Sequence, residues 1–394
     1  MWPEGLRQNG FMKICILQVL HTPNDKRVFH KEAKTLAAAG HEVLSIVPSE
    51  ETLPAVMDGV HIQTYRVGRG MKGRFVALLK LVPKAWQARA DVYLCVEPET
   101  WVTGLIVKAL TGRKVIFDQH EHVPSKFADK FPRGIRGLIQ RLTVQGMRIM
   151  ARFTDQILLT KACLDEAYTG LPTPRTIVLN TNHLRPPCAS VPSELAAKYV
   201  GRPVIIHQGL FGDVRGSYQL LEAIKILVGT HRDLKCILLG KYIYGDEQAY
   251  RDAIQEAGLG HVIDLYAEIP FDEVPPYIAL SKVGLVLFQP GPMNHTLAMP
   301  HKMFDYMREE VPLIAPAFAV EVNSIISAAD CGLLVDVSDP VALAKAIAYL
   351  LEHPEEARRL GENGRKAVET TYHWENDARK LLDVFDAVKP AAGR

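Results

Sequence analysis

The sequence lacks long apolar segments and any ordered pattern of cysteines. No run of about 18 uncharged apolar residues occurs in the 394-residue chain, so no transmembrane helix is predicted. The six cysteines are scattered and form no Cys-x-x-Cys or Cys/His spacing, which argues against a structural zinc site and a disulfide framework. These absences predict a protein of the reducing cytoplasm.

A strong net charge is also absent, although basic residues gather in two segments. The formal net charge is +2, so the chain as a whole is not expected to bind nucleic acid. Residues 61–90 and 130–154 contain no acidic residue, and basic side chains are interleaved there with apolar ones. Each segment is either a solvated helix face or a surface that docks on an anionic membrane, the inner face of the cell membrane in this case.

Several catalytic motifs are missing. The chain has no Gly-x-Ser-x-Gly nucleophile elbow, no His-Glu-x-x-His and no paired-aspartate metal motif, which makes serine hydrolase and metallohydrolase chemistry unlikely. The nucleotide-binding signatures Gly-Lys-[Ser/Thr] and Gly-x-Gly-x-x-Gly are absent as well. We therefore expect no metal ion and no cofactor.

Short apolar strands alternate with helical segments along the whole chain, which is typical of α/β architecture with parallel sheets. Two doubly wound, Rossmann-like domains are predicted, at residues 12–185 and 204–373. Between them lies a predicted linker, residues 186–203, which contains four prolines. Ligands in such sheets bind beyond the carboxyl ends of the strands, so the loops that follow strands, facing a cleft between the domains, are expected to carry the chemistry.

The first such loop, residues 209–217, reads GLFGDVRGS and separates a predicted strand from a predicted helix. Gly209 and Gly216 permit a tight turn and close backbone approach. The following helix start offers free N–H groups, and Arg215 adds a positive charge, a combination that suits phosphate. A plain strand–turn–helix with a surface arginine is the alternative.

The second loop, residues 291–307, leads into another helix start. Pro300 suits the first helical turn, whereas Lys302 in that turn is unfavourable for the helix dipole unless an anion is present. Such a conflict is expected at functional sites. Asp305, one turn later, can accept hydrogen bonds from ribose hydroxyls. In the alternative interpretation, Lys302 simply extends to solvent.

Polar residues also follow three strands of the first predicted domain. Asp25 and Arg27 follow the first strand, Glu97 follows another, and His120 with Glu121 ends a third. His120 beside carboxylates could act as a general base or orient a hydroxyl, and a structural histidine is the alternative. The clustering predicts that these residues form the rim of an acceptor or sugar site.

These segments together resemble the family 4 retaining glycosyltransferases of the GT-B fold, in particular bacterial members that act on surface polysaccharides. The matching segments keep the family's order, and they are residues 25–43, 117–121, 209–224, 300–315 and 335–368. The resemblance runs over nearly the whole chain from Met12. It implies a C-terminal helix, residues 374–390, that crosses back to the first domain.

The resemblance also implies residue roles. Arg215 takes the place of the cation that holds the donor diphosphate, Lys302 assists it, and His120 occupies the position that meets the transferred sugar. The remaining positions of the implied donor site are Gly209, Gly216, Asp305, Met299 and Ile269. Several family positions differ here, because Leu297 and Asp305 each replace a glutamate and Leu210 replaces an arginine. The segment that often reads His-Asp-Pro-Glu in the family has Val96 and Glu97 in its first two positions here.

The predicted function is metal-independent transfer of a sugar, with retention of configuration, from a UDP- or GDP-linked donor to a saccharide or lipid-linked acceptor. Such a reaction serves polysaccharide or glycolipid biosynthesis. One alternative is a hydrolysing nucleotide-sugar 2-epimerase, for which Glu97 and Glu121 would exchange the sugar proton. Another is a catalytically idle protein that binds sugar nucleotides as a scaffold, which the Leu297 and Leu210 replacements favour.

Overall fold

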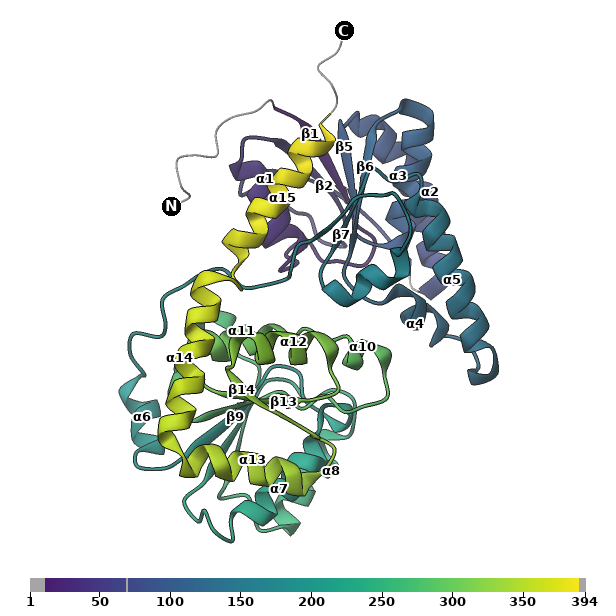
Figure 1. Cartoon of the computed structure of the whole chain (residues 1–394). Coiled ribbons are helices and arrows are strands. Elements are labelled where there is room, and N and C mark those ends of the chain that lie inside the picture. Colours follow the sequence, from purple (N-terminus) through teal and green to yellow (C-terminus); the bar gives the residue numbers. More distant parts are fainter. Residues whose placement is uncertain (1–10, 69, 390–394) are drawn as a thin grey trace. The chain divides into compact units, whose positions relative to one another are not determined.

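The structure is a computed structural model that describes residues 11–68 and 70–389. The chain forms two compact units, one made of Met1–Asn180 with Trp374–Arg394 and the other of Thr181–His373. Each unit contains a sheet of mainly parallel strands with helices, as Figure 1 shows. The predicted pair of Rossmann-like α/β domains is confirmed.

The N-terminal unit is built on a sheet with the strand order β3-β4-β2-β1-β5-β6-β7-β8 within the described residues. All neighbouring strands pair in parallel except β3 and β4, which are antiparallel. The strands are β1 (Lys13–Leu17), β2 (Glu42–Pro48), β3 (Val56–Met57), β4 (Val60–Tyr65), β5 (Val92–Cys95), β6 (Lys114–Gln119), β7 (Gln156–Leu159) and β8 (Arg175–Ile177). Strands β5 and β7 are buried along their whole length, as expected from their mainly apolar sequences.

The helical segments of this unit follow the strands in alternation. They are η1 (Val28–Ala33), α1 (Lys34–Ala38), α2 (Gly70–Ala88), α3 (Pro98–Thr111), α4 (Val123–Ala128), η2 (Arg133–Ile135), α5 (Arg136–Ala151), η3 (Ala162–Tyr168) and α15 (Trp374–Val388). The two predicted basic segments supply α2 and α5, although residues 61–65 of the first belong to strand β4. Arg69 of that segment lies outside the described residues.

Helix α15 belongs to the N-terminal unit although it follows the whole C-terminal unit in sequence. The Trp374 side chain is buried, and its indole N–H donates to the Thr35 hydroxyl at 3.0 Å. Leu381 and Phe385 join the apolar cluster that contains Ile14 and Phe29. The expected return of the C-terminal helix is therefore confirmed.

The C-terminal unit has an all-parallel sheet with the strand order β11-β10-β9-β12-β13-β14 in the described chain. Its strands are β9 (Val204–Gln208), β10 (Lys235–Leu239), β11 (Ile263–Tyr266), β12 (Val283–Leu285), β13 (Leu313–Pro316) and β14 (Gly332–Val335). Its helical segments are α6 (Ser193–Tyr199), η4 (Asp213–Arg215), α7 (Ser217–Leu227), α8 (Glu247–Glu256), η5 (Phe271–Glu273), α9 (Pro275–Ala279), α10 (Met293–Thr296), α11 (His301–Arg308), α12 (Val320–Ala329), α13 (Pro340–Glu352) and α14 (Pro354–Thr370).

The segment predicted as a linker, residues 186–203, lies inside the C-terminal unit. It contains helix α6, whose Tyr199 is buried and donates its hydroxyl to Asp264 at 2.9 Å. The Cys188 N–H also donates to the Glu309 carboxylate at 2.7 Å. The prolines indicated irregular chain, but these contacts attach the segment to the unit, and the division falls after Asn180.

Among the helices of residues 11–68 and 70–389, none combines the length and the apolar character that crossing a bilayer requires.

Candidate functional site

The first predicted phosphate loop leaves the end of β9 and enters helix α7 through two glycines with positive φ. Gly209 has φ +88° and Gly216, at the N-terminus of α7, has φ +82°. A Cβ atom on Gly216 would lie 2.7 Å from the Leu287 carbonyl oxygen, closer than van der Waals contact allows. The sequence therefore needs glycine here, and the turn brings the start of α7 next to the end of β12.

Arg215 lies in this turn, partly buried and without an anionic partner among the described residues. Its guanidinium carbon is 4.5 Å from the centre of the Phe288 ring and 5.6 Å from that of Tyr244. The Nε atom is buried and has no hydrogen-bond partner in the described chain. Burial lowers the pKa of Arg215, an effect that Tyr244 opposes, but an arginine stays charged. A buried donor without a partner indicates a place for a ligand.

Lys302 lies in the first turn of α11, and its side chain is buried. Its ammonium nitrogen donates to Nε2 of His207 at 2.9 Å and would lie 3.9 Å from a Cβ atom placed on Gly209. Burial holds the pKa of Lys302 well below its usual range, and Arg215 lowers it further while Asp305 opposes both. The alternative in which Lys302 simply extends to solvent is therefore wrong.

His207 is a residue of this site that the sequence analysis missed. It is buried in β9, and burial together with the charges of Lys302 and Arg215 keeps its pKa well below the usual value, so the ring is neutral. Since Nε2 accepts from Lys302, the ring proton resides on Nδ1, which has no partner among the described residues. A single histidine inside the apolar strand sequence VIIHQ was the signal that could have indicated it.

Asp305, predicted to contact ribose, is instead engaged inside the protein. Its side chain is buried and accepts from the Asn182 amide at 2.8 Å and from the Gln208 amide at 3.0 Å. Arg308 forms an ion pair with it at 3.6 Å. The carboxylate thus ties α11 to β9, and its contact with a ribose stays a prediction.

The two other predicted donor residues have apolar surroundings. Met299 and Ile269 are partly buried against the cluster that contains Val286 and Phe288. Phe288 is the ring on which Arg215 packs. A contact of Met299 or Ile269 with a donor stays a prediction.

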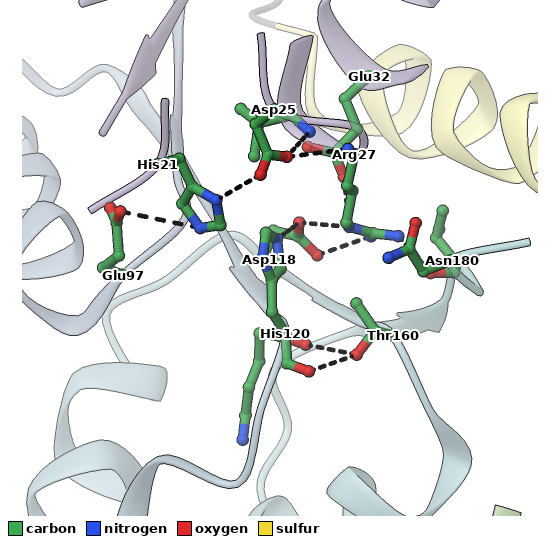
Figure 2. Close-up of polar contacts among 12 residues, drawn as sticks. His21, Asp25, Arg27, Glu32, Glu97, Asp118, His120, Thr160 and Asn180 are labelled. Carbon is green, nitrogen blue, oxygen red and sulfur yellow. Dashed lines mark hydrogen bonds and ion pairs between the residues drawn. The ribbon is translucent and has the colours of Figure 1, made fainter. Parts of the chain in front are cut away.

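In the N-terminal unit, Arg27 is buried and forms a two-pronged ion pair with Asp118 at the end of β6, as Figure 2 shows. Its Nε and Nη2 atoms each donate to one Asp118 oxygen at 2.9 Å, and Nη1 donates to the Val178 carbonyl at 3.1 Å. These partners hold Arg27 inside the unit, and its predicted place on an acceptor rim stays a prediction.

His120 directly follows β6, and its side chain is held by that of Asp118. Its Nε2 donates to the Asp118 carboxylate, and its ring meets that of His21 edge-on with the centres 5.0 Å apart. Thr160 donates to the His120 carbonyl at 2.9 Å, a contact also drawn in Figure 2. The chain Arg27–Asp118–His120 therefore fixes the orientation of a partly exposed imidazole.

Asp25 lies in the loop after β1 and contacts His21, the histidine whose ring meets that of His120. Its carboxylate accepts from the Arg27 and Val28 N–H groups at 2.8 Å and from Nδ1 of His21 at 2.9 Å. Although burial alone would raise the pKa of Asp25, the hydrogen bond from His21 and the two N–H groups hold it far below the usual value. Asp25 is thus an anion that holds His21.

Glu97 and Glu121 differ sharply in their surroundings. Glu97 is buried, caps the start of α3, and accepts from the Val19 and Leu20 N–H groups, the latter at 2.8 Å. Burial raises the pKa of Glu97, while His21 opposes the effect. Glu121 is exposed and forms an ion pair with Lys126. The rim position predicted for both fits Glu121 better than Glu97.

A cavity of about 540 Å³ in the N-terminal unit brings His120, Glu97 and Glu121 together in its lining. Leu20, Val102 and other apolar side chains form much of its remaining wall.

A group of possible metal ligands lies beside this cavity. Single ligand atoms of Glu32, Asp118 and His120 lie within 4.8 Å of one another. Arg27, however, already pairs with Glu32 at 3.0 Å and with Asp118 at 2.9 Å, and burial raises the pKa of Glu32 well above its usual range. A guanidinium therefore supplies the positive charge here, and the group does not fit a metal ion.

Two family models match the chain. Residues 194–367 match the glycosyl transferases group 1, and residues 26–182 match the glycosyl transferase 4-like domain. Together with the two Rossmann-like units, these matches indicate a glycosyltransferase of the GT-B fold.

The chain is 24% identical over 191 residues to spore coat protein SA of Bacillus subtilis (strain 168), a match that covers 47% of this chain and 49% of that protein. It is 22% identical over 173 residues to the MMP α-(1→4)-mannosyltransferase of Mycolicibacterium hassiacum, covering 44% of this chain and 40% of the relative. The chain thus spans about half the length, or less, of these relatives.

Among solved structures, Anabaena HepE in complex with UDP has the same fold. It superimposes with a TM-score of 0.74 at 13% identity, over 95% of this chain and 99% of the HepE chain.

Proposed function

We propose that the protein transfers a sugar from a nucleotide-sugar donor to a saccharide or lipid-linked acceptor. The observation that carries the proposal is the pair of cations at the loop that follows β9: the Arg215 Nε atom is buried without a partner in the described chain, and the Lys302 ammonium nitrogen lies 3.9 Å from a Cβ atom placed on Gly209. Neither forms an ion pair of 4 Å or less with a carboxylate of the described chain. Buried charges of one sign are costly unless an opposite charge joins them, and a diphosphate supplies it.

The same cations suit the chemistry of the transfer. Negative charge grows on the diphosphate as its bond to the sugar breaks, and fixed positive groups that await it lower the barrier. Lys302 and the free N–H groups at the starts of α7 and α11 add to Arg215. This arrangement balances the leaving group with protein charges alone, which supports transfer without a metal ion.

The donor is proposed to be UDP- or GDP-linked. HepE, which shares the fold, was solved with UDP, and the relative from Mycolicibacterium hassiacum is a mannosyltransferase. Both facts support hexosyl transfer from a nucleotide-sugar. The loop that precedes Pro300 is proposed to select the sugar, with Met299 on the donor side.

His120 is proposed to orient the transferred sugar and to place the chain's own carbonyl near the positive charge that develops on it. Asp118 and Arg27 hold the imidazole, so the group is positioned before substrate arrives. Retention of configuration, with attack on the face from which the diphosphate leaves, follows from the resemblance of the motif segments to retaining enzymes.

The N-terminal unit is proposed to bind the acceptor and to dock on the inner face of the cell membrane. Helix α5 exposes Leu138, Leu142 and Ile149, and Arg141 and Arg152 lie beside them and are exposed too. Anionic lipid attracts such a surface. Polysaccharide or glycolipid biosynthesis is the setting that fits this location.

The epimerase alternative is weaker. It needs carboxylates that are able to take and return a sugar proton, yet Glu97 already accepts from the Val19 and Leu20 N–H groups. The scaffold alternative depends on Leu297 and Leu210, and the paired cations at Arg215 do not distinguish it from an enzyme.

The proposal is tested by a thermal-shift panel of UDP-, GDP- and ADP-sugars with the unmodified protein, Arg215→Ala and Arg251→Ala. Arg251 is an exposed arginine of α8 that pairs with Glu247, so its loss is a matched control. One nucleotide class should raise the melting temperature of the unmodified protein and of Arg251→Ala only, because ligand binding stabilises the folded state.

Product analysis with saccharide and lipid-linked acceptors then separates the three functions. A glycosylated acceptor supports the proposal, a free epimerised sugar supports the epimerase, and binding without turnover supports the scaffold. Failure of every nucleotide-sugar to stabilise the unmodified protein overturns the proposal.

A further inference from the structure

The cavity of the N-terminal unit is large and has mainly apolar walls. Its volume of about 540 Å³ is typical of small-molecule sites, which span roughly 300–1,000 Å³. Helices α2, α3 and α4 contribute the side chains of Leu78, Val102 and Phe127, and Leu20 and Val96 extend the same surface. Polar lining residues such as Glu99, Gln119 and Lys130 can bind saccharide hydroxyls, but the apolar side chains form more of the exposed wall and suit a hydrocarbon chain.

Polar groups of the cavity are gathered mainly where the sheet ends. His21 and His120 meet there, with Glu97 3.8 Å from the His21 ring. A second polar pair, Glu121 with Lys126, lies on the helix α4 side. The cavity therefore combines an apolar body with a polar end at the histidine proposed to act in transfer.

The helices that line the cavity also expose apolar side chains on the outer surface. On α2, Leu78 lines the cavity while its neighbour Leu79 is 57% exposed; on α5, Thr143 lines it while Leu142 is 59% exposed. Leu138, Leu142 and Ile149 are spaced by four and seven residues, which places them on one face of α5. Two of the helices that line the cavity thus also carry exposed apolar side chains on the outside of the unit.

We propose that this cavity holds the apolar chain of an amphiphilic acceptor, a polyprenyl- or acyl-linked molecule, with its polar end at His120. The inference rests on the proposed function and narrows the acceptor from any saccharide to one with a lipid chain. Burial of the chain provides the binding energy, since each methylene removed from water strengthens binding about fourfold. The basic residues of α5 then match the anionic membrane that contains such acceptors.

The test measures binding of methyl, hexyl and octyl β-D-glucoside below the concentration at which micelles form, by calorimetry and thermal shift. We expect affinity to rise steeply from methyl to octyl glucoside. In Val102→Trp, whose larger side chain fills the cavity, this dependence on chain length should be lost. It should persist in Val341→Trp, because Val341 is an exposed residue of α13 in the other unit.

A second control separates the cavity from the outer surface. Leu142→Glu removes an exposed apolar side chain of α5, and octyl glucoside should still bind to it as to the unmodified protein. Equal binding of the three glucosides, or a dependence that survives Val102→Trp but disappears in Leu142→Glu, overturns the inference. If Val102→Trp does not fold, Leu78→Gln, which places an amide in the same wall, serves in its place.

Nucleotide binding, measured in the same samples, keeps the two proposals apart. Suppose that a nucleotide-sugar stabilises Val102→Trp, but that glucoside binding to the unmodified protein does not depend on chain length. This result overturns the proposal of an amphiphilic acceptor and leaves the proposed function intact. Absence of nucleotide stabilisation from every sample overturns the proposed function, whatever the glucosides do.

Discussion

The Lys302 ammonium nitrogen lies 2.9 Å from Nε2 of His207, and both side chains are buried in the C-terminal unit. A neutral imidazole is an unusual partner for a buried lysine, because it accepts a hydrogen bond without cancelling the charge. The lysine is therefore held in place, and in its protonated form its charge stays available to an anion. Arg215 acts on both residues and adds to the same positive potential.

Replacing either cation should reduce turnover. Arg215→Ala is expected to lower kcat by on the order of a hundredfold, since a lost electrostatic partner of the leaving group has an effect of that size. Lys302→Ala should act likewise. Steady-state kinetics with the donor identified by thermal shift measures both, and Arg251→Ala should leave the rate unchanged. A normal rate in Arg215→Ala would contradict the assignment of the phosphate loop.

Binding of UDP should be accompanied by proton uptake. Burial, reinforced by Arg215, lowers the pKa of Lys302 in the free protein, and a bound diphosphate favours the charged ammonium and raises it again. Affinity should therefore fall as pH rises above the free-state pKa. Titration calorimetry in buffers of different ionisation enthalpy counts the protons, and Lys302→Met should abolish the uptake. Proton release on binding would disprove this account.

The Arg27–Asp118 pair should contribute strongly to stability. Asp118→Asn leaves Arg27 buried with a weaker partner, and breaking a buried ion pair costs about 3–5 kcal/mol. Turnover should also fall, because His120 loses its acceptor. Urea unfolding gives the stability change, with Asp129→Asn as control. Asp129 is 58% exposed where it pairs with Arg136, so its replacement should change stability by less than about 1 kcal/mol.

His21 should give the protein a pH-dependent stability. Burial alone would lower its pKa, but the hydrogen bond to Asp25 and the charges of Glu97, Asp25 and Asp118 raise it above the unfolded value of 6.5. The stabilising contribution is fully present below pH 6.5 and is lost as pH rises through the folded-state pKa. The difference in unfolding free energy between the unmodified protein and His21→Gln should therefore shrink above pH 6.5. If the unfolding free energies of the two proteins changed in parallel with pH across that range, the proposed contribution of His21 would be refuted.

Anionic vesicles should retain the protein at low salt through α5. Leu142→Glu and Arg141→Gln are each expected to weaken sedimentation with phosphatidylglycerol vesicles, and the single basic charge that Arg141→Gln removes should account for about fivefold. Val341→Glu on α13 is the matched control and should sediment like the unmodified protein. Retention that is unaffected by either α5 replacement would contradict the role of this helix.

Strand prediction from the sequence succeeded where an apolar run is buried on both sides. Strands β1, β5 and β9 are all of this kind. Strand β14 was missed because, unlike β5 of the same length, it is only partly buried. Strand β4 was missed because the alternating sequence VHIQTY sits in a segment dominated by its basic charge.

For the site, the sequence predicts which residues follow the end of a strand, but not which partners their side chains contact. A loop after a parallel strand identifies the end of the sheet where ligands bind, which is how Arg215, Lys302 and His120 were proposed. Whether a side chain there points inward depends on partners far along the chain. Arg27 meets a carboxylate that follows it by 91 residues, and Asp305 meets an amide that precedes it by 123. Local sequence contains no sign of either.

The return of α15 to the N-terminal unit has a consequence for the order of events on the ribosome. Thr35 and Trp374 are 339 residues apart, and Leu381 and Phe385 complete the apolar cluster around Ile14. The Thr181–His373 unit has all of its own sequence before α15 is synthesised. It can therefore finish folding first, while the unit that begins the chain waits, with part of its core uncovered, for its last helix.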